Sequence, residues 1–406
     1  MTTSWDCFDT LVTRRKLDPL TVFHDMGARL GMPDFTHRRK AAESRAPWTL
    51  ASIYEELAKD YGWSDAEKER IKALEIEAEL EHCCPIVENL RQVKDGDLIV
   101  SDMYLPAEVI EQILRKNGLT ADVQIFVSTG GKSSGTIWGT LPHIDQHIGD
   151  NLHSDFHSPQ THGIIGVHYT NVFPSPVERA VGGELCLLMR LIRLANPYQP
   201  GSVLHSMWHE QAQLNIPALI LAALEIPATN VTFMMRDCIH LQPIHQALHG
   251  TINNSFHASR LAFEGDTPAF RKHAECAARG RLIVDLQGTG GSIINYWRKV
   301  FNETPELLYV TGTLSGGHLL AYCHHDAIER FNSSCLGSMR KDWPGRFVCE
   351  YDPTVIKCQL AAVQYAIKQL PFFSIAPDLD RLRWLVSLMP DSVTFAENNH
   401  QSSHGD

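Results

Sequence analysis

Short apolar runs alternate with amphipathic segments along the first 175 residues. The runs at residues 97–102 and 123–128 have the length and residue types of buried strands. Residues 105–117 have the apolar spacing of a helix that stops before Gly118, and residues 166–173 have the pattern of a closing strand. Strands that alternate with helices predict an α/β fold with a parallel, doubly wound sheet.

A helix-rich segment interrupts this alternation directly after the first predicted strand, a short run that ends at Asp6. Residues 19–84 carry apolar residues at helical spacing, with Thr49 and Ser64 at two helix starts. A further helix is predicted over residues 85–92. We interpret residues 19–84 as a helical cap or lid, because a helical block inserted behind the first strand end suits that role.

The second half of the chain repeats the α/β pattern after a break. Residues 176–201 contain Pro and Gly punctuation around a mainly apolar helix, and they predict a linker with an inter-domain helix. From about residue 202 strands and helices alternate again. We predict a second α/β domain over residues 202–390 and a flexible polar tail over residues 391–406.

Composition narrows the class of protein. The chain has 406 residues with 44% hydrophobic and 20% charged content, which is typical of a globular protein of two domains. Its net charge of -11 argues against a nucleic-acid surface but permits a small phosphorylated ligand. There is no signal-peptide pattern, membrane-spanning run or CxxC pair, so we expect a cytoplasmic protein with reduced cysteines.

Polar groups end or follow four of the predicted strands of the first domain. Asp6 ends the first strand, Ser101 the second, and Lys132 follows the third. Asp150 and Asp155 follow the fourth. Because the carboxyl ends of parallel strands share one edge of a sheet, we expect these side chains to converge there.

These residue types suit phosphoryl transfer. Asp6 can attack phosphorus as a carboxylate nucleophile, while Ser101 and Lys132 can bind the phosphoryl oxygens and offset their charge. Asp150 and Asp155 are hard oxygen ligands of the kind that Mg²⁺ prefers. The sequence therefore predicts catalytic Asp6, Ser101 and Lys132 and a magnesium cofactor.

The four segments resemble the four motifs of the haloacid dehalogenase (HAD) superfamily. Residues 6–10 match the first motif, Ser101 within residues 99–106 the second, Lys132 the third, and Gly149-Asp150 with Asp155 the fourth. Residues 8–14 and 101–106 are also similar to a subgroup of predicted HAD hydrolases with an extra C-terminal domain.

This resemblance covers residues 1–175 and implies a Rossmann-like domain with a helical cap. It implies hydrolysis or transfer through an aspartyl-phosphate on a small phosphorylated metabolite, a sugar phosphate or a nucleotide. Thr10 and Asp102 lie in the same motifs and are expected to contact the phosphate or the substrate. The Mg²⁺ ligands that it implies are Asp6, the backbone of Phe8, Asp150 and Asp155.

Phe8 departs from the phosphatase pattern, in which a second aspartate two positions after the nucleophile acts as general acid and base. Dehalogenases also have an aromatic residue there, but they work without Mg²⁺, so the intact Asp150–Asp155 pair favours phosphoryl chemistry. Asp9 lies one residue too far along to substitute in an obvious way. Losing a general acid costs about 10²–10⁴-fold, so a binding or regulatory protein with weak turnover is an alternative.

Three other basic residues are alternative candidates for anion contacts. Lys116 is the rival to Lys132, although a cation at a helix end is favoured for other reasons. Arg14 and Arg15 lie just past the first turn and can either reach a substrate anion or stay solvated.

The second domain carries a glycine-rich turn between a strand and a helix. Successive backbone N–H groups at residues 288–292 predict an anion cradle. The segment resembles the phosphoribosyl-pyrophosphate loop of type I phosphoribosyltransferases, although Leu286 stands at the usual second acidic position and the spacing to Thr289 is one residue short. The other reading is a glycine turn needed only for tight packing.

Under this resemblance Asp285 contacts ribose hydroxyls, and Thr289, Gly290, Gly291 and Ser292 hold a phosphate. The earlier loop on the pyrophosphate side is then formed by Arg236 and Asp237, with Ser259-Arg260 as a flexible basic contact. A transferase centred on Asp285, with the first domain accessory, is a second enzymatic alternative.

The chain's 21 histidines suggest one further cluster, Cys323-His324-His325-Asp326. Adjacent residues point in different directions on a helix or a strand, and no second pair stands at a matching spacing. We therefore expect no metal there, and we expect His153 and His157 to be surface loop residues.

Overall fold

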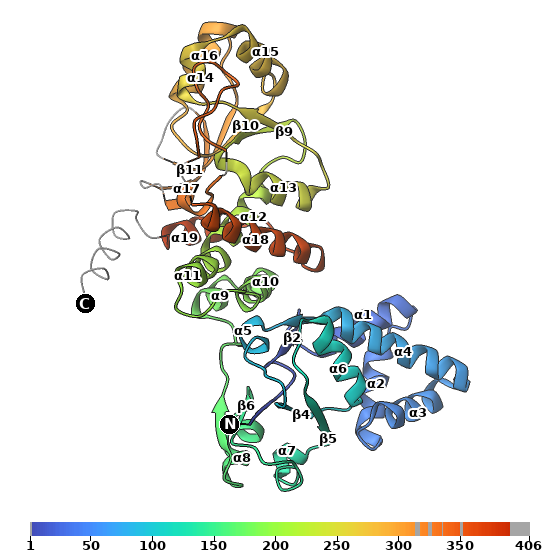
Figure 1. Ribbon diagram of the computed structural model, residues 1–406. Helices are drawn as coiled ribbons and strands as arrows, with labels where there is room; N and C mark the ends of the chain where they lie inside the picture. The colour runs from blue at the N-terminus through green and yellow to red at the C-terminus, as the bar shows by residue number, and fades with distance from the viewer. Residues whose placement is uncertain (1, 313–316, 324–326, 335, 350–351, 390–406) are drawn as a thin grey trace, which may run out of the picture. The chain divides into compact units, whose positions relative to one another are not determined.

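The computed structural model describes residues 2–312, 317–323, 327–334, 336–349 and 352–389. The chain divides into two compact units, the first of residues 1–176 and 194–197 and the second of residues 177–193 and 198–406. Each unit contains a five-stranded sheet whose strands all run parallel. The predicted α/β class with parallel sheets is confirmed (Figure 1).

The sheet of the first unit has the strand order β5-β4-β1-β6-β7. Its strands are β1 (Thr3–Trp5), β4 (Leu98–Asp102), β5 (Gln124–Ser128), β6 (Gln146–Gly149) and β7 (Ile165–His168). The chain adds strands on one side of β1 and then returns to the other side. Such a reversal opens a crevice at the carboxyl ends of the central strands, where α/β proteins bind ligands.

Four consecutive helices lie between two short strands of the first unit (Figure 1). They are α1 (Leu20–Leu30), α2 (Phe35–Arg45), α3 (Leu50–Tyr61) and α4 (Asp65–His82). The predicted starts of two of them are correct, since the Thr49 and Ser64 hydroxyls accept hydrogen bonds from Ser52 N and Glu67 N, each at 3.3 Å. These side chains satisfy backbone donors that the first helical turn leaves without a partner.

The ends of this helical segment are joined by an antiparallel pair of strands, β2 (Val12–Arg14) and β3 (Cys83–Pro85). The predicted helix over residues 85–92 was therefore wrong at its start, and only α5 (Val87–Leu90) is helical. Pairing of Thr13 with Cys84, residues far apart in sequence, decides this conformation, and local periodicity carries no signal of it.

The remaining helices of the first unit are short, apart from one. They are α6 (Ala107–Lys116), α7 (Gly131–Ser134), the π-helical turn η1 (Leu152–His157) and α8 (Ser158–Gln160). Helix α6 packs a fully buried apolar face, including Ile110 and Ile113, into the same core as Ile53 of α3 and Ile99 of β4. One core therefore joins the cap helices to the sheet.

The sheet of the second unit has the order β12-β11-β10-β8-β9, so the chain reverses direction across the sheet between β8 and β10. Its strands are β8 (Val231–Met235), β9 (Asn254–His257), β10 (Leu282–Gln287), β11 (Leu307–Gly312) and β12 (His318–Tyr322). The helices from residue 176 to residue 277 are α9 (Pro176–Val181), α10 (Gly183–Leu194), α11 (Val203–Glu210), η2 (Gln211–Asn215), α12 (Ile216–Glu225), η3 (Asp237–Ile239), α13 (Leu241–His249), α14 (Arg260–Gly265) and α15 (Pro268–Ala277). Those that follow are α16 (Gly291–Phe301), α17 (Ala327–Phe331), α18 (Pro353–Gln369), η4 (Leu370–Phe372) and α19 (Leu379–Ser387).

Some expectations meet the structure only in part. The predicted strand over residues 166–173 is the shorter β7, and the tail over residues 391–406 lies outside the described residues. None of the helices in the described ranges has the length and apolar character that crossing a membrane requires.

Candidate functional site

The first unit brings its predicted polar residues to one edge of the sheet. Asp6 directly follows β1, the central strand, and Ser101 lies near the end of its neighbour β4. Lys132 lies in α7 after β5, and Asp150 follows β6 on the other side of β1. The convergence comes from the parallel topology, because each of these residues ends or follows a strand at its carboxyl end.

A buried ion triad forms the centre of this edge. The Lys132 Nζ donates to Asp6 Oδ1 at 2.5 Å and to Asp155 Oδ1 at 2.7 Å, and its side chain is only 3% exposed. Burial alone lowers the pKa of Lys132, but the two carboxylates outweigh it and hold the pKa above its ordinary value. Lys132 is therefore charged at neutral pH and links the two acids.

Lys116, the rival candidate, lies elsewhere. Its Nζ donates to the Leu80 carbonyl at 2.7 Å near the end of α6. Lys132 is thus the cation that the structure brings to Asp6.

The two acids of the triad respond differently to burial. Burial raises the pKa of Asp6 to about 8, with help from Asp155 and Asp150 and against the attraction of Lys132. For Asp155, burial is outweighed by hydrogen bonds from His147 and Lys132 and by the charge of Lys132, so its pKa lies below the ordinary value. Asp155 thus remains ionised and acts as the fixed anion of the group.

Asp155 is held by three donors. Its Oδ1 accepts from Lys132 and from His147 Nε2 at 3.2 Å, and its Oδ2 accepts from the Asn151 backbone N–H at 3.0 Å. Gly149 permits this position, because a Cβ there would lie 2.5 Å from Asp155 Oδ2. Both oxygens are thus occupied by hydrogen bonds within the protein.

His147 is a member of the site that the sequence analysis did not identify. It is fully buried on β6, and its Nδ1 lies 2.8 Å from the Ser4 hydroxyl. Burial lowers the pKa of His147 to about 4, so the ring is neutral at pH 7. A neutral ring that faces a carboxylate at Nε2 carries its proton there and accepts from Ser4 at Nδ1. Ser4 and His147 are brought together only by the pairing of β1 with β6, so the sequence alone does not indicate this contact.

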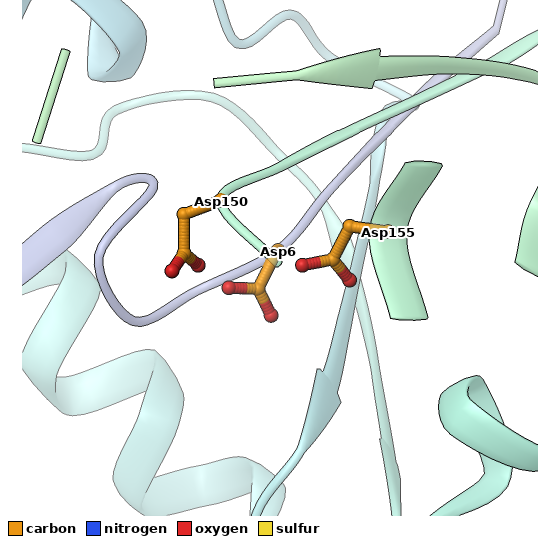
Figure 2. Close-up of side chains that lie close together, drawn as sticks. All are labelled: Asp6, Asp150 and Asp155. Atoms are coloured by element: carbon orange, nitrogen blue, oxygen red, sulfur yellow. The ribbon is translucent and has the colours of Figure 1, made fainter. Parts of the chain in front are cut away.

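Asp150 completes a cluster of three carboxylates. Asp6, Asp150 and Asp155 each offer an oxygen, and these oxygens lie within 4.8 Å of one another (Figure 2). Burial, then the charge of Asp9, raises the pKa of Asp150 to about 6. Three acids against one lysine leave an excess of negative charge on hard oxygen donors, and these residues fit Mg²⁺ in donor type and charge.

Three more predicted residues lie around Asp6. The Thr10 hydroxyl donates to Asp6 Oδ2 at 3.4 Å. Ser101 is 2% exposed, and its hydroxyl makes no hydrogen bond to another described residue. Asp102 instead accepts from the backbone N–H groups of Lys132 at 3.1 Å and Ser133 at 3.3 Å, so its contacts position the start of α7.

Phe8 faces a charged partner. The Arg14 guanidinium carbon lies 4.4 Å from the centre of the Phe8 ring, and Arg14 also donates to both oxygens of Glu79 in α4, at 3.0 and 2.9 Å. The Phe8 side chain thus packs against a residue that is bound to helix α4.

In the second unit a cavity of about 440 Å³ opens at the carboxyl ends of β8 and β10. Its lining includes every residue that the sequence predicted for a ligand in this unit: Arg236, Asp237, Asp285, Thr289, Gly290, Gly291 and Ser292. Ser259 and Arg260 also line it. The two segments come together because their strands are neighbours in the sheet.

The glycine loop in this cavity has a mixed role. Gly290 has φ 74°, and a Cβ there would lie 2.7 Å from the Tyr309 hydroxyl, so packing alone requires this glycine. A Cβ at Gly291, the first residue of α16, would meet nothing within 4 Å. Packing therefore leaves the choice of glycine at 291 unexplained, whereas access to the backbone N–H groups explains it.

Other residues of this cavity were not singled out from the sequence. Tyr309 stands beside Asp285 in the register of β10 and β11, and its buried hydroxyl has no hydrogen-bond partner among the described residues. Burial, then the charge of Asp237, raises the pKa of Asp285 well above its ordinary value. Arg346 and Glu329 also line the cavity. Tyr309 lies in β11, Glu329 in α17 and Arg346 in a later loop, and none of these segments carries a recognisable motif.

The segment Cys323-His324-His325-Asp326 lies mostly outside the described residues, since only Cys323, a buried residue, is described. No protein-family model matches the chain, and no curated protein sequence shows significant similarity to it.

Replacing Lys132 by Met is expected to destabilise the protein by about 3–5 kcal/mol at pH 7.5, because it leaves the ionised, buried Asp155 without its cation and removes the hydrogen bond to Asp6. Urea unfolding measures this free energy. Lys116→Met is the matched control and is expected to stay within about 1 kcal/mol of the wild type. An equal effect of both substitutions would contradict the ion triad.

Asp150→Asn is expected to stabilise the metal-free protein at pH 8 and to lose this advantage toward pH 4. The folded protein holds a proton on Asp150 up to about pH 6, whereas the unfolded chain releases it near 3.8, so folding weakens as the pH rises between these values. The expected gain is about 1–2 kcal/mol after solvent screening.

Unfolding in EDTA across pH 4–8 tests this expectation, with the exposed Asp122→Asn as control. If the difference in unfolding free energy does not depend on pH, or if the variant is less stable than the wild type at pH 8, the raised pKa of Asp150 is wrong.

Proposed function

We propose that the first unit is a HAD-type phosphohydrolase or phosphotransferase that acts through an aspartyl-phosphate on a small phosphorylated metabolite, a sugar phosphate or a nucleotide. The observation that carries the proposal is the cluster of Asp6, Asp150 and Asp155 with Lys132 at the carboxyl edge of a parallel sheet. The similarity of the four segments to HAD motifs supports the same chemistry.

In this proposal Asp6 attacks phosphorus with a carboxylate oxygen, and the bond from phosphorus to the leaving oxygen breaks. Water then attacks phosphorus in the acyl phosphate, which releases inorganic phosphate and restores the Asp6 carboxylate. Lys132 and the Ser101 hydroxyl hold phosphoryl oxygens and offset the charge that develops on them. Asp155 fixes Lys132, and His147 fixes Asp155, so the charges are in place before the substrate binds.

Asp6 and Asp150 would hold Mg²⁺, together with the backbone of Phe8 and with Asp155 nearby. When bound, the cation offsets negative charge on the phosphoryl group and helps to orient it. Ionisation of Asp6, which burial makes costly, becomes favourable beside a cation.

Phe8 shapes the expected substrate. A phenyl ring cannot protonate the departing oxygen, so turnover favours substrates whose leaving group is stable as an anion. An acyl phosphate or an aryl phosphate meets this condition better than a simple alkyl phosphate.

Phosphate release from a panel of acyl, aryl, sugar and nucleotide phosphates, with Mg²⁺, tests this function. The wild type is expected to release phosphate and Asp6→Asn to lose at least about 10³-fold, because the nucleophile is gone. Asp122→Asn is the control, since it alters an exposed carboxylate that precedes the start of β5, away from the carboxyl edge of the sheet.

The third variant, Phe8→Asp, separates an enzyme from a binding protein. Turnover that appears only in Phe8→Asp would indicate that the natural protein binds phosphate without turning it over. If neither the wild type nor any variant releases phosphate, the hydrolase proposal is wrong.

A second candidate function, binding of a phosphorylated sugar or nucleotide in the second unit, rests on the cavity around the glycine loop. Its lining offers the N–H groups at the start of α16 and three arginines, which suit a phosphate. The same lining offers Asp237 and Asp285, which suit hydroxyl groups. A phosphoribosyltransferase-like reaction centred on Asp285, with the first unit accessory, is the enzymatic form of this proposal.

Gly291→Ala is expected to weaken binding of ribose 5-phosphate or AMP at least about tenfold while leaving the unfolding free energy within about 1 kcal/mol of the wild type. The added methyl enters open space beside the N–H groups, so it obstructs a ligand and no protein atom. Isothermal titration measures binding.

Gly139→Ala is the matched control, since its Cβ would also meet nothing within 4 Å. Equal ligand affinity of the wild type and Gly291→Ala, or destabilisation by this substitution alone, would favour a purely structural glycine turn.

A further inference from the structure

A second cavity of the second unit adjoins the one at the glycine loop. It is a groove of about 260 Å³ between α14 and α16, two helices that pack against each other (Figure 1). Arg260, Phe263 and Ser292 line both the groove and the larger cavity. The groove alone is smaller than most ligand pockets, which measure roughly 300–1,000 Å³. We therefore interpret it as an extension of the larger cavity.

One face of α16 forms a wall of this groove. Ser292, Asn295 and Lys299 line it, and they lie on one side of the helix because they are three and four residues apart. From Ser292 to Lys299 the helix rises by about 10 Å, so the groove leads away from the glycine loop along α16. The buried rings of Phe263 and Tyr296, 5.1 Å apart between centroids, hold α14 against α16.

Arg260 differs from the other two arginines of the larger cavity. Arg236 pairs with Asp237 at 2.5 Å, and Arg346 donates to the Gly337 carbonyl at 2.8 Å. Arg260, the exposed first residue of α14, makes no hydrogen bond or ion pair with another described residue. Its guanidinium is therefore available to an anion at the point where the two cavities meet.

The acids around the groove already have cations of their own. Glu264 pairs with Lys341 at 3.0 Å, and Asp266 pairs with Arg271 at 2.6 Å and with Lys299 at 3.2 Å. These acids therefore leave the charge of Arg260 uncompensated. The N–H groups at the start of α16 add a second positive group beside it, since Ser292 lines the same junction.

We propose that the anion bound at the start of α16 is the diphosphate of a diester, with one substituent in the larger cavity and the other in the groove. The larger cavity of about 440 Å³ and the groove meet at this point, so an anion there has open volume on both sides. A terminal phosphate uses only one of the two volumes. Arg260 and the N–H groups of α16 are separate anion-binding groups, which suits two phosphates better than one.

This inference rests on the second candidate function, ligand binding at the glycine loop, and it names the class of ligand. The substituent in the larger cavity meets Asp237 and Asp285, which suit hydroxyl groups. The other substituent lies along α16 toward Asn295 and Lys299.

Isothermal titration with AMP and with ADP-ribose tests the proposal. ADP-ribose contains AMP and adds a second phosphate with a substituent, so we expect the wild type to bind it at least about tenfold more tightly than AMP. Asn295→Trp fills the groove and is expected to abolish this difference without changing the affinity for AMP. Arg260→Met is expected to weaken both ligands at least about tenfold, because it removes a charged donor from the anion.

The matched controls lie on the same helix. Arg298→Trp adds an equally large ring at an exposed position outside both linings, and Asn295→Ala leaves the groove open. Both controls are expected to keep the preference for ADP-ribose. Asn295 is exposed, so its substitutions are expected to leave the urea midpoint of unfolding close to that of the wild type.

The outcomes separate this inference from the function beneath it. Equal affinity of the wild type for AMP and ADP-ribose, or a preference that persists in Asn295→Trp, would overturn the diester and leave ligand binding at the glycine loop standing. Wild-type affinities in Arg260→Met would overturn the position of the anion at the junction. Binding of neither ligand to the wild type would overturn both the second candidate function and this inference.

Discussion

The first unit depends on holding charge in a place that excludes water. Lys132, at 3% exposure, neutralises part of the charge on Asp6 and Asp155, and a carboxylate buried without such a partner would simply take up a proton. One cation cannot balance three acids, so ionisation of Asp6 and Asp150 stays costly and their pKa values lie above the ordinary value. That remaining charge is what makes the three carboxylates fit a cation, and it follows from burial and topology together.

The cap is attached by charges as well as by apolar packing. Arg14 on β2 pairs with Glu79 of α4, and inside the cap the fully buried Arg39 donates to both oxygens of Glu75 at 2.8 Å. Tyr54 also donates to Glu75, at 2.8 Å. Buried ion pairs add little net stability over apolar packing, but they penalise any arrangement that separates the partners. We therefore interpret them as fixing the orientation of the cap helices.

The sequence allowed the strand ends to be predicted because each chemical group follows a short apolar run. Asp6, Lys132 and Asp150 are found from that local pattern alone. His147 and β3 are not, since each depends on a partner that only the folded chain supplies. His147 needs Ser4, and Cys84 needs Thr13. In the second unit the glycine loop could be predicted from the sequence, but the cavity residues Tyr309 and Arg346 could not.

The two units share a reversal of strand order in the sheet and differ in the balance of charge beside it. Each sheet reverses its strand order, and each collects polar residues at the carboxyl ends of the strands beside the reversal. In the first unit three acids face one lysine, which leaves an excess of negative charge at this edge. The cavity of the second unit carries acids and arginines in equal number: Asp237, Asp285, Glu329, Arg236, Arg260 and Arg346. Such a balance suits a ligand that is anionic at one end and hydroxylated at the other, with no added charge required.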